Sequence, residues 1–308
     1  MNEKNDNAAS IVHPIRRRQA LGGLAAIAAG ILGLPAGVRG GAAGETGKLV
    51  ASKGRINQSI VQWCFKKYWD LDGICRIAKD LGCKSVELVE PEDWPILKKH
   101  GLISALTGSH GFEKGMNDPR NHAMCAEKIR KSVDLCAEAG FPSVITFTGF
   151  REGIADDLGL ENCVKGLKGV IGYCEKKKID LCLEMLNSRV AVEMKGHPGY
   201  QGDHVDYCME IIRRVGSDRM KLLFDIYHVQ IMDGDVIARI RQYKDSIGHY
   251  HVAGNPGRGE LDSRQEINFR PILEEIARTG YKGYVGQEFV PTRDPLEGLR
   301  EAVAVCDV

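Results

Sequence analysis

The chain has 308 residues, of which 43% are hydrophobic and 27% are charged, a composition typical of a globular protein. Its 42 basic and 41 acidic residues nearly cancel, and only 6% of its residues are aromatic. A nucleic-acid partner is therefore not expected, because binding to nucleic acid needs a basic surface or stacking side chains.

Residues 1–45 differ from the rest of the chain and are predicted to be an export signal with a linker. The triplet Arg16–Arg18 precedes an uncharged stretch, 20–38, that is rich in Ala, Gly and Leu. Basic, apolar and small-residue regions in this order are typical of export signals. The segment IRRRQALGGLAAIAAG resembles a twin-arginine signal, which implies a folded periplasmic protein without stable membrane insertion after cleavage. An uncleaved N-terminal membrane anchor is the alternative.

The chain has ten cysteines, most of them in apolar strand-like runs or in helix-like segments, and none forms a C-x-x-C pair. This pattern favours buried free thiols over disulfides or zinc ligands.

Residues 46–308 are predicted to form a single α/β domain. Eight short apolar runs are the expected strands: 56–65, 85–89, 103–109, 143–148, 180–186, 221–226, 248–253 and 284–289. Apolar residues recur between them at helical spacing, as in 122–139 and 160–178. The residues expected to mark helix boundaries are Gly82, Gly101, Gly140, Gly280 and, as an N-cap, Asp235.

Eight alternating strands and helices over about 260 residues match a (β/α)₈ TIM barrel. A doubly wound sheet is the alternative fold, but it usually carries a Gly-rich phosphate-binding motif after its first strand. The sequence there is QWCFKKYWD, which lacks that motif. The barrel is therefore the favoured fold.

Four polar residues end four successive predicted strands: Glu184 in LCLEMLN, Asp225 in LLFDIYH, His251 in GHYHVAG and Glu288 in VGQEFVP. A lone Asp there is more often a helix cap, and a lone His is more often a core residue. The carboxyl ends of adjacent barrel strands, however, meet on one rim, roughly 5 Å apart. Three carboxylates and one imidazole suit Mg²⁺ or Mn²⁺, with Co²⁺ as a further option.

The segments around these residues resemble the hydroxypyruvate isomerase family of the xylose isomerase-like barrels. The motifs that carry the resemblance are SVELVEPEDWP (85–95), LEMLNSR (183–189), FDIYHVQIMDGD (224–235) and HYHVAGNPGRGELDSRQEINF (249–269). The resemblance covers most of residues 55–305. It implies that Glu184 and Glu288 are both metal ligands and proton-transferring bases, and that Asp225 and His251 are ligands only.

The resemblance also implies substrate contacts for His228 and Arg258, with Glu260 orienting Arg258. Glu87, in the second predicted strand, is a candidate for a contact with substrate or for a supporting role behind the site. His110, at the end of the third predicted strand, is a further candidate. Each has an ordinary alternative, such as an exposed loop side chain or a structural ion pair.

The sequence departs from the family at His251, where Gln is typical of hydroxypyruvate isomerases and His is usual in ketose 3-epimerases. We therefore expect a metal-dependent isomerase of the aldose–ketose type that acts on a small hydroxy-carbonyl compound or sugar. The alternatives are a ketose 3-epimerase, an inosose dehydratase-like or keto-glycoside lyase, and a non-catalytic exported metal- or sugar-binding barrel. A homo-oligomer is compatible with the sequence.

Overall fold

The computed structural model describes residues 49–308, which belong to one compact unit. The predicted export signal, 1–45, lies outside the described residues and stays a prediction. Within 49–308, no helix is both long enough and apolar enough to cross a membrane.

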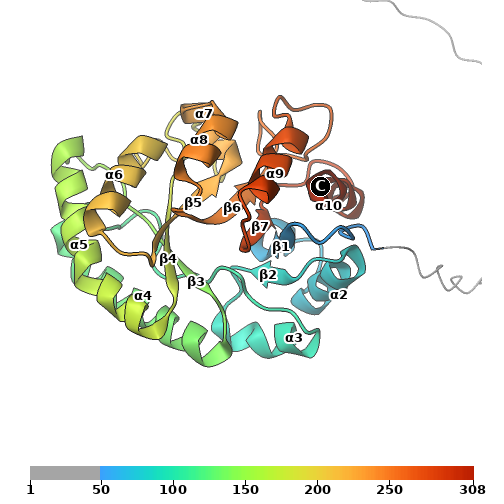
Figure 1. The fold of residues 1–308 in the computed structure, drawn as a ribbon, viewed down its shortest axis with the longest axis horizontal. Coiled ribbons are helices and arrows are strands. Elements are labelled where there is room, and N and C mark those ends of the chain that lie inside the picture. Colours follow the sequence, from blue (N-terminus) through green and yellow to red (C-terminus); the bar gives the residue numbers. More distant parts are fainter. Residues whose placement is uncertain (1–48) are drawn as a thin grey trace, which may run out of the picture. The chain divides into compact units, whose positions relative to one another are not determined.

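Seven parallel strands form one curved sheet in the order β2-β1-β7-β6-β5-β4-β3. The strands are β1 (Asn57–Val61), β2 (Ser85–Glu87), β3 (Ser143–Thr146), β4 (Asp180–Glu184), β5 (Met220–Asp225), β6 (Ile247–Val252) and β7 (Tyr284–Gln287). They lie at the centre of the molecule with helices around them, as Figure 1 shows. The predicted TIM barrel is confirmed.

The opening between β2 and β3 is closed by Ile103–Thr107, which makes up most of the segment 103–109 expected to be the third strand. This segment makes only isolated parallel bridges, to Ser85 on one side and Val144 on the other. The Ser85 hydroxyl accepts a hydrogen bond from Ala105 N at 2.9 Å, and the Ser104 hydroxyl donates to a backbone carbonyl two residues along. Short polar side chains that bond the backbone compete with a regular strand ladder. An irregular segment therefore occupies the eighth position of the barrel.

Ten α-helices and two 3₁₀ helices alternate with the strands of the described residues. They are α1 (Gln62–Phe65), α2 (Leu71–Leu81), η1 (Pro91–Asp93), α3 (Trp94–Lys99), η2 (Pro119–Asn121), α4 (His122–Ala139), α5 (Asp156–Lys177), α6 (Val205–Val215), α7 (Ile226–Met232), α8 (Val236–Tyr243), α9 (Phe269–Arg278) and α10 (Pro295–Cys306). The first predicted strand was too long, because its last four residues form α1. A short apolar run does not by itself distinguish strand from helix.

The predicted helix ends are confirmed, since Gly82, Gly101, Gly140 and Gly280 all have positive φ. This left-handed conformation is favourable for glycine at a helix C-terminus. The prediction for Asp235 was wrong in one respect. Helix α8 does begin at Val236, but the Asp235 carboxylate makes no capping hydrogen bond, and the residue itself has a φ of 48°.

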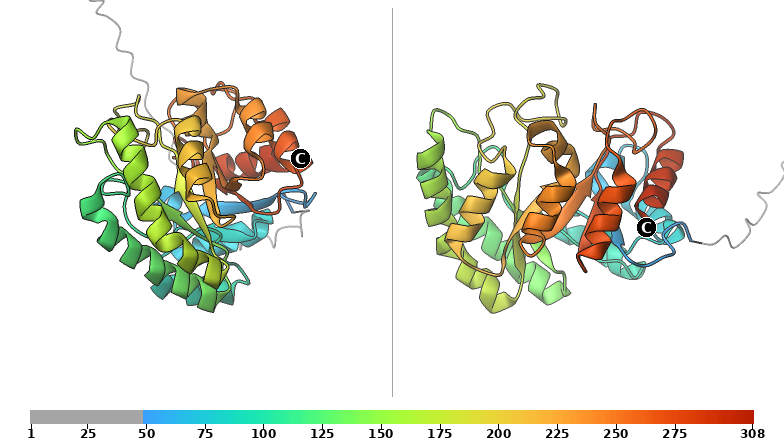
Figure 2. Two further views of the ribbon diagram at one scale, coloured as in Figure 1. Left: turned by 60° about the vertical axis from the view of Figure 1, so that its left-hand side comes forward. Right: turned by 45° about the horizontal axis from the view of Figure 1, so that its top comes forward.

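The barrel interior holds its own apolar cluster, separate from the larger core between the sheet and the helices. Its buried members are Leu106, Ile145, Phe147, Cys182, Leu186, Tyr200 and Leu223. All ten cysteines are buried and free, as the sequence predicted. The loops that follow the strands gather at one end of the barrel, and the right-hand view of Figure 2 shows those after β4 and β6 on the same rim.

The inner cluster predicts a large difference between two leucine truncations. Leu106 is fully buried in this cluster, whereas Leu158, on α5, is 54% exposed. We expect Leu106→Ala to lower the free energy of unfolding by roughly 2–5 kcal/mol, and Leu158→Ala to change it by about 0.5 kcal/mol or less. Urea denaturation of the two variants measures this difference, and equal effects would contradict the assignment of Leu106 to the interior.

Candidate metal centre

Four residues predicted as ligands converge at the carboxyl ends of four neighbouring strands. Glu184 and Asp225 are the last residues of β4 and β5, His251 is the fifth residue of β6, and Glu288 directly follows β7. Parallel pairing places Asp225 opposite His251. Each of the four offers one ligand atom, these atoms lie within 4.8 Å of one another, and all four residues are buried.

The His251 imidazole lies between two groups of carboxylates. Its Nδ1 is 2.8 Å from Glu288 Oε2 and 3.8 Å from Glu184 Oε1, while its Nε2 is 2.8 Å from Glu87 Oε1. Despite these distances, the buried Nδ1 forms no well-aligned hydrogen bond. Burial lowers the pKa of His251, but the carboxylates outweigh that effect and raise it well above its usual range. The position in front of Nδ1 therefore attracts positive charge.

Arg258 is a buried cation that contacts two of the carboxylates. Its Nη2 donates to Glu288 Oε2 at 2.6 Å and lies 3.4 Å from Asp225 Oδ2, while its Nη1 donates to Met194 O at 2.6 Å. The guanidinium lies over the Trp63 ring, 5.3 Å from its centroid. One guanidinium cannot balance three buried carboxylates.

This environment shifts the pKa values of the three carboxyl groups in different directions. Burial raises the pKa of Asp225 to about 7 although Arg258 opposes the change. Burial also raises the pKa of Glu184. Burial acts in the same direction on Glu288, but Arg258 and His251 together hold its pKa well below the usual range. A divalent cation would remove the cost of ionising the first two, because a bound cation favours the charged form of its ligands. The residues present therefore fit a hard divalent ion.

A cavity of about 320 Å³ opens beside this centre. Its lining residues are Trp63, Leu88, Gly108, Ser109, His110, Gly111, Phe112, Ile145, Phe147, Glu184, Leu186, Met194, His197, Arg258 and Glu288. Glu184 and Glu288 thus open onto the cavity, while Asp225 and His251 do not line it and are fully buried. A small molecule in the cavity would meet the two glutamates directly.

His228 lies at the first turn of α7, three residues after Asp225, and is fully buried. Its Nδ1 accepts a hydrogen bond from Asn187 N at 3.1 Å, so its hydrogen lies on Nε2. The Nε2 has no hydrogen-bond partner and lies 3.5 Å from Asp225 Oδ2. Burial lowers the pKa of His228 well below its usual range, so the ring is neutral at pH 7.

Two other candidate site residues, His110 and Glu260, have their polar atoms engaged elsewhere. His110 lines the cavity, but its Nδ1 bonds to Gly111 O and its Nε2 to Thr146 Oγ1. Glu260 does not line this cavity. Its carboxylate accepts hydrogen bonds from Thr292 N and Oγ1, and no hydrogen bond joins it to Arg258 within residues 49–308. The expectation that Glu260 orients Arg258 is corrected accordingly.

Of the two roles expected for Glu87, its position agrees with support behind the site and not with contact with substrate. It is fully buried behind His251 and does not line the cavity. Its Oε1 accepts hydrogen bonds from both His249 Nε2 and His251 Nε2, at 2.9 and 2.8 Å. Burial raises the pKa of Glu87, but the two imidazoles outweigh it and lower the pKa to about 2. The carboxylate is therefore ionised.

Sequence reasoning missed two contributions to the cavity. The indole N–H of Trp63 donates to Glu288 Oε1 at 3.1 Å. His197, in the loop after β4, packs its ring 4.4 Å from that of Phe112. Burial lowers the pKa of His197 to about 4, so it is neutral at pH 7. The loop that carries His197 has no periodic pattern from which this position could be predicted. Trp63, by contrast, lies near the end of the first predicted strand, where side chains of a barrel can reach the site.

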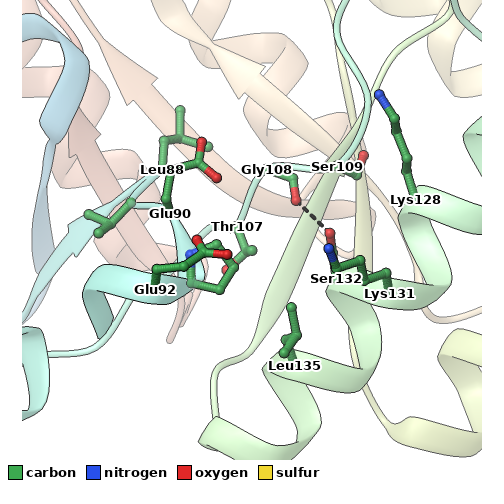
Figure 3. Close-up of a pocket in the computed structure, with 12 residues that line it drawn as sticks. Leu88, Glu90, Glu92, Thr107, Gly108, Ser109, Lys128, Lys131, Ser132 and Leu135 are labelled. Atoms are coloured by element: carbon green, nitrogen blue, oxygen red, sulfur yellow. Dashed lines mark hydrogen bonds between the residues drawn. The ribbon is translucent and has the colours of Figure 1, made fainter. Parts of the chain in front are cut away.

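A second hollow, of about 360 Å³, lies on the other side of the 107–109 segment (Figure 3). Figure 3 shows Glu90 and Glu92 on one side of it and Lys128 and Lys131 of α4 on the other. None of the four predicted metal ligands lines this hollow. The candidate centre therefore belongs to the first cavity alone.

The sequence of the chain matches that of a known protein family. Residues 75–307 match the sequence profile described as xylose isomerase-like TIM barrel. A human protein named as a candidate hydroxypyruvate isomerase is 27% identical over 260 residues, which cover 78% of this chain and 91% of that protein. The hydroxypyruvate isomerase of Escherichia coli K12 is 36% identical over 103 residues, which cover 33% of this chain and 40% of that protein.

Among solved structures, a family 2 AP endonuclease from Brucella melitensis aligns with a TM-score of 0.70 and 22% identity. The alignment covers 80% of this chain and 96% of that chain, and at this identity it supports the fold alone. The match over residues 75–307 spans most of the chain and includes all four residues of the candidate centre. The chain belongs to the xylose isomerase-like TIM barrel family.

Proposed function

We propose that the chain is a divalent-metal-dependent isomerase or epimerase that moves a proton on a small hydroxy-carbonyl compound or sugar. One observation carries this proposal. Glu184 and Glu288 face the cavity from the same cluster in which Asp225 and His251 lie behind them. The relatives named as hydroxypyruvate isomerases support the same class of reaction. A protein that only bound a ligand would not need two glutamates on the reacting side.

Glu184, Asp225, His251 and Glu288 would hold the ion, which we expect to be Mg²⁺ or Mn²⁺, with Co²⁺ as a further option. When bound, such an ion polarises a substrate carbonyl and stabilises negative charge on its oxygen. The same ligands are ionised once a cation is present, so both glutamates stay available as bases.

The two glutamates are held differently, and this suits proton transfer between them. Glu288 is fixed on both oxygens, by Trp63 at Oε1 and Arg258 at Oε2. In the described residues, no hydrogen bond restrains the Glu184 carboxylate, which lies 3.8 Å from His251 Nδ1. We propose that Glu184 removes a proton from the carbon next to the carbonyl, and that Glu288 acts on the other side of the substrate.

In that step the C–H electron pair forms a carbon–carbon double bond, and the carbonyl pair moves to oxygen to give an enediolate. Return of the proton to the neighbouring carbon, with transfer of the hydroxyl proton between the oxygens, completes an isomerisation. Delivery of a different proton to the opposite face of the same carbon, from Glu288 after it has taken one from solvent, completes an epimerisation, and Glu184 then loses its proton to solvent. We propose that Arg258, which lines the cavity, donates to a substrate oxygen, whereas His228, whose Nε2 hydrogen is unpaired, is fully buried and does not line the cavity.

The proton-transfer proposal predicts hydrogen exchange at carbon. With Mn²⁺ in D₂O, we expect NMR to show exchange of a C–H hydrogen in at least one of hydroxypyruvate, free ketoses and keto-glycosides. Glu184→Gln and Glu288→Gln should each lower that rate by about 10²–10⁴-fold, because each removes one base. Product analysis then separates isomerase, epimerase and lyase outcomes.

The matched control for this experiment is Glu275→Gln, which alters a buried glutamate of α9 that bonds Arg241 and Arg278 rather than the centre. Its exchange rate should equal that of the unaltered chain. Exchange that persists in both active-site variants, or is absent with every compound, would contradict the proposal.

Metal binding should also be visible in stability. At a Mn²⁺ concentration about 100 times the dissociation constant, we expect stabilisation of about 2.7 kcal/mol over the chelator-treated protein. Differential scanning calorimetry would record this as a rise in Tm of several degrees. Asp225→Asn should remove most of the rise, because it deletes a buried ligand that does not line the cavity. An identical Tm with Mn²⁺ and with chelator would contradict a metal centre.

A further inference from the structure

Glu87 reaches His251 across the inside of the barrel. It lies on β2, while His249 and His251 lie on β6, and β1 and β7 separate these strands in the sheet. One oxygen, Oε1, accepts a hydrogen bond from the Nε2 of each histidine. The three residues are almost completely buried, and the two imidazole planes are nearly perpendicular at 88°. Such a contact between non-adjacent strands requires open space between them.

Gly286 on β7 provides that space. A Cβ added at this position would lie 2.6 Å from Glu87 Oε1 and 2.8 Å from His251 Cδ2. Any side chain at residue 286 would therefore displace the carboxylate, the imidazole or both. The contact between Glu87 and His251 is therefore possible because residue 286 is a glycine.

The contact determines which nitrogen of His251 can bind an ion. A carboxylate oxygen accepts and does not donate, so the Nε2 of His251 must carry the hydrogen. A bound metal ion would take the place of the second hydrogen, so the lone pair that it meets is on Nδ1, the atom that faces Glu184 and Glu288. A carboxylate behind a ligating histidine fixes the orientation of the ring and makes it a stronger ligand.

We propose that Glu87 is a positioning residue that presents His251 Nδ1 to the metal ion, and that His249 holds Glu87 in place from the other side. This inference rests on the proposed function, because it assumes the metal centre. Of the two roles expected from the sequence for Glu87, it selects support behind the site and gives that support a specific target, the His251 ring. His249, which lies outside the predicted ligand set, becomes part of the support for that set.

The test is Mn²⁺ binding to the full chain after removal of metal, measured from the free-ion EPR signal. We expect Glu87→Gln to weaken Mn²⁺ binding by about 10–100-fold. Spin-echo EPR of the unaltered protein should show nitrogen coupling from His251, and this coupling should weaken in the variant. A purely structural role would lower Tm without changing the nitrogen coupling.

Glu275→Gln again serves as the matched control, since it removes the charge of another buried glutamate away from the centre. If Glu87→Gln does not fold, His249→Gln and Gly286→Ala test the same contact from its other partners. Both should weaken Mn²⁺ binding. Unchanged affinity and unchanged nitrogen coupling in the folded variants would overturn the inference alone, whereas no Mn²⁺ binding by the unaltered chain would overturn the metal centre as well.

Discussion

Mutual repulsion among three buried carboxylates is the constraint on which this structure depends. Glu184, Asp225 and Glu288 present their oxygens within 4.8 Å of one another in a buried region, where like charges repel strongly. The parallel strands fix the backbone positions from which these three side chains converge. A compensating positive charge is then required, and Arg258 supplies only part of it. The negative charge that Arg258 leaves uncompensated is the physical reason for proposing a divalent ion at this position.

In the same arrangement, only the two glutamates among the four predicted ligands face the cavity. Asp225 and His251 lie behind the cavity wall, and Glu87 and His249 lie further inside the barrel. Of the two glutamates that open onto the cavity, Glu288 is held by hydrogen bonds from Trp63 and Arg258, whereas no hydrogen bond within residues 49–308 holds the Glu184 carboxylate. Because sites held by rigid strands keep their geometry better than sites on loops, the barrel can hold the backbones of the two glutamates in a fixed relation to each other.

Much of this arrangement could be predicted because strand ends are visible in sequence. Glu184, Asp225, His251 and Glu288 each follow an apolar run, and parallel strands bring such ends to one rim. The irregular pairing of segment Ile103–Thr107 was not predictable from hydrophobicity, because hydrogen bonds from or to serine hydroxyls interrupt its strand pairing.

The contacts of Glu87 and Glu260 also escaped prediction. Glu87 reaches His251 only because the barrel curves and Gly286 has no side chain. Glu260 turns away from Arg258 to bond the backbone and hydroxyl of Thr292. Both depend on the direction of a side chain in three dimensions, which sequence spacing does not specify. Residue type and strand position therefore predicted the ligand set, while its supporting contacts required the fold.

The most direct test of the metal centre is an anomalous difference map from a crystal of the chain soaked in Mn²⁺. We predict one strong peak among Glu184, Asp225, Glu288 and the Nδ1 of His251, with the Nε2 of His251 still bonded to Glu87. A crystal with no peak there, or with manganese bound only at other positions, would contradict the account.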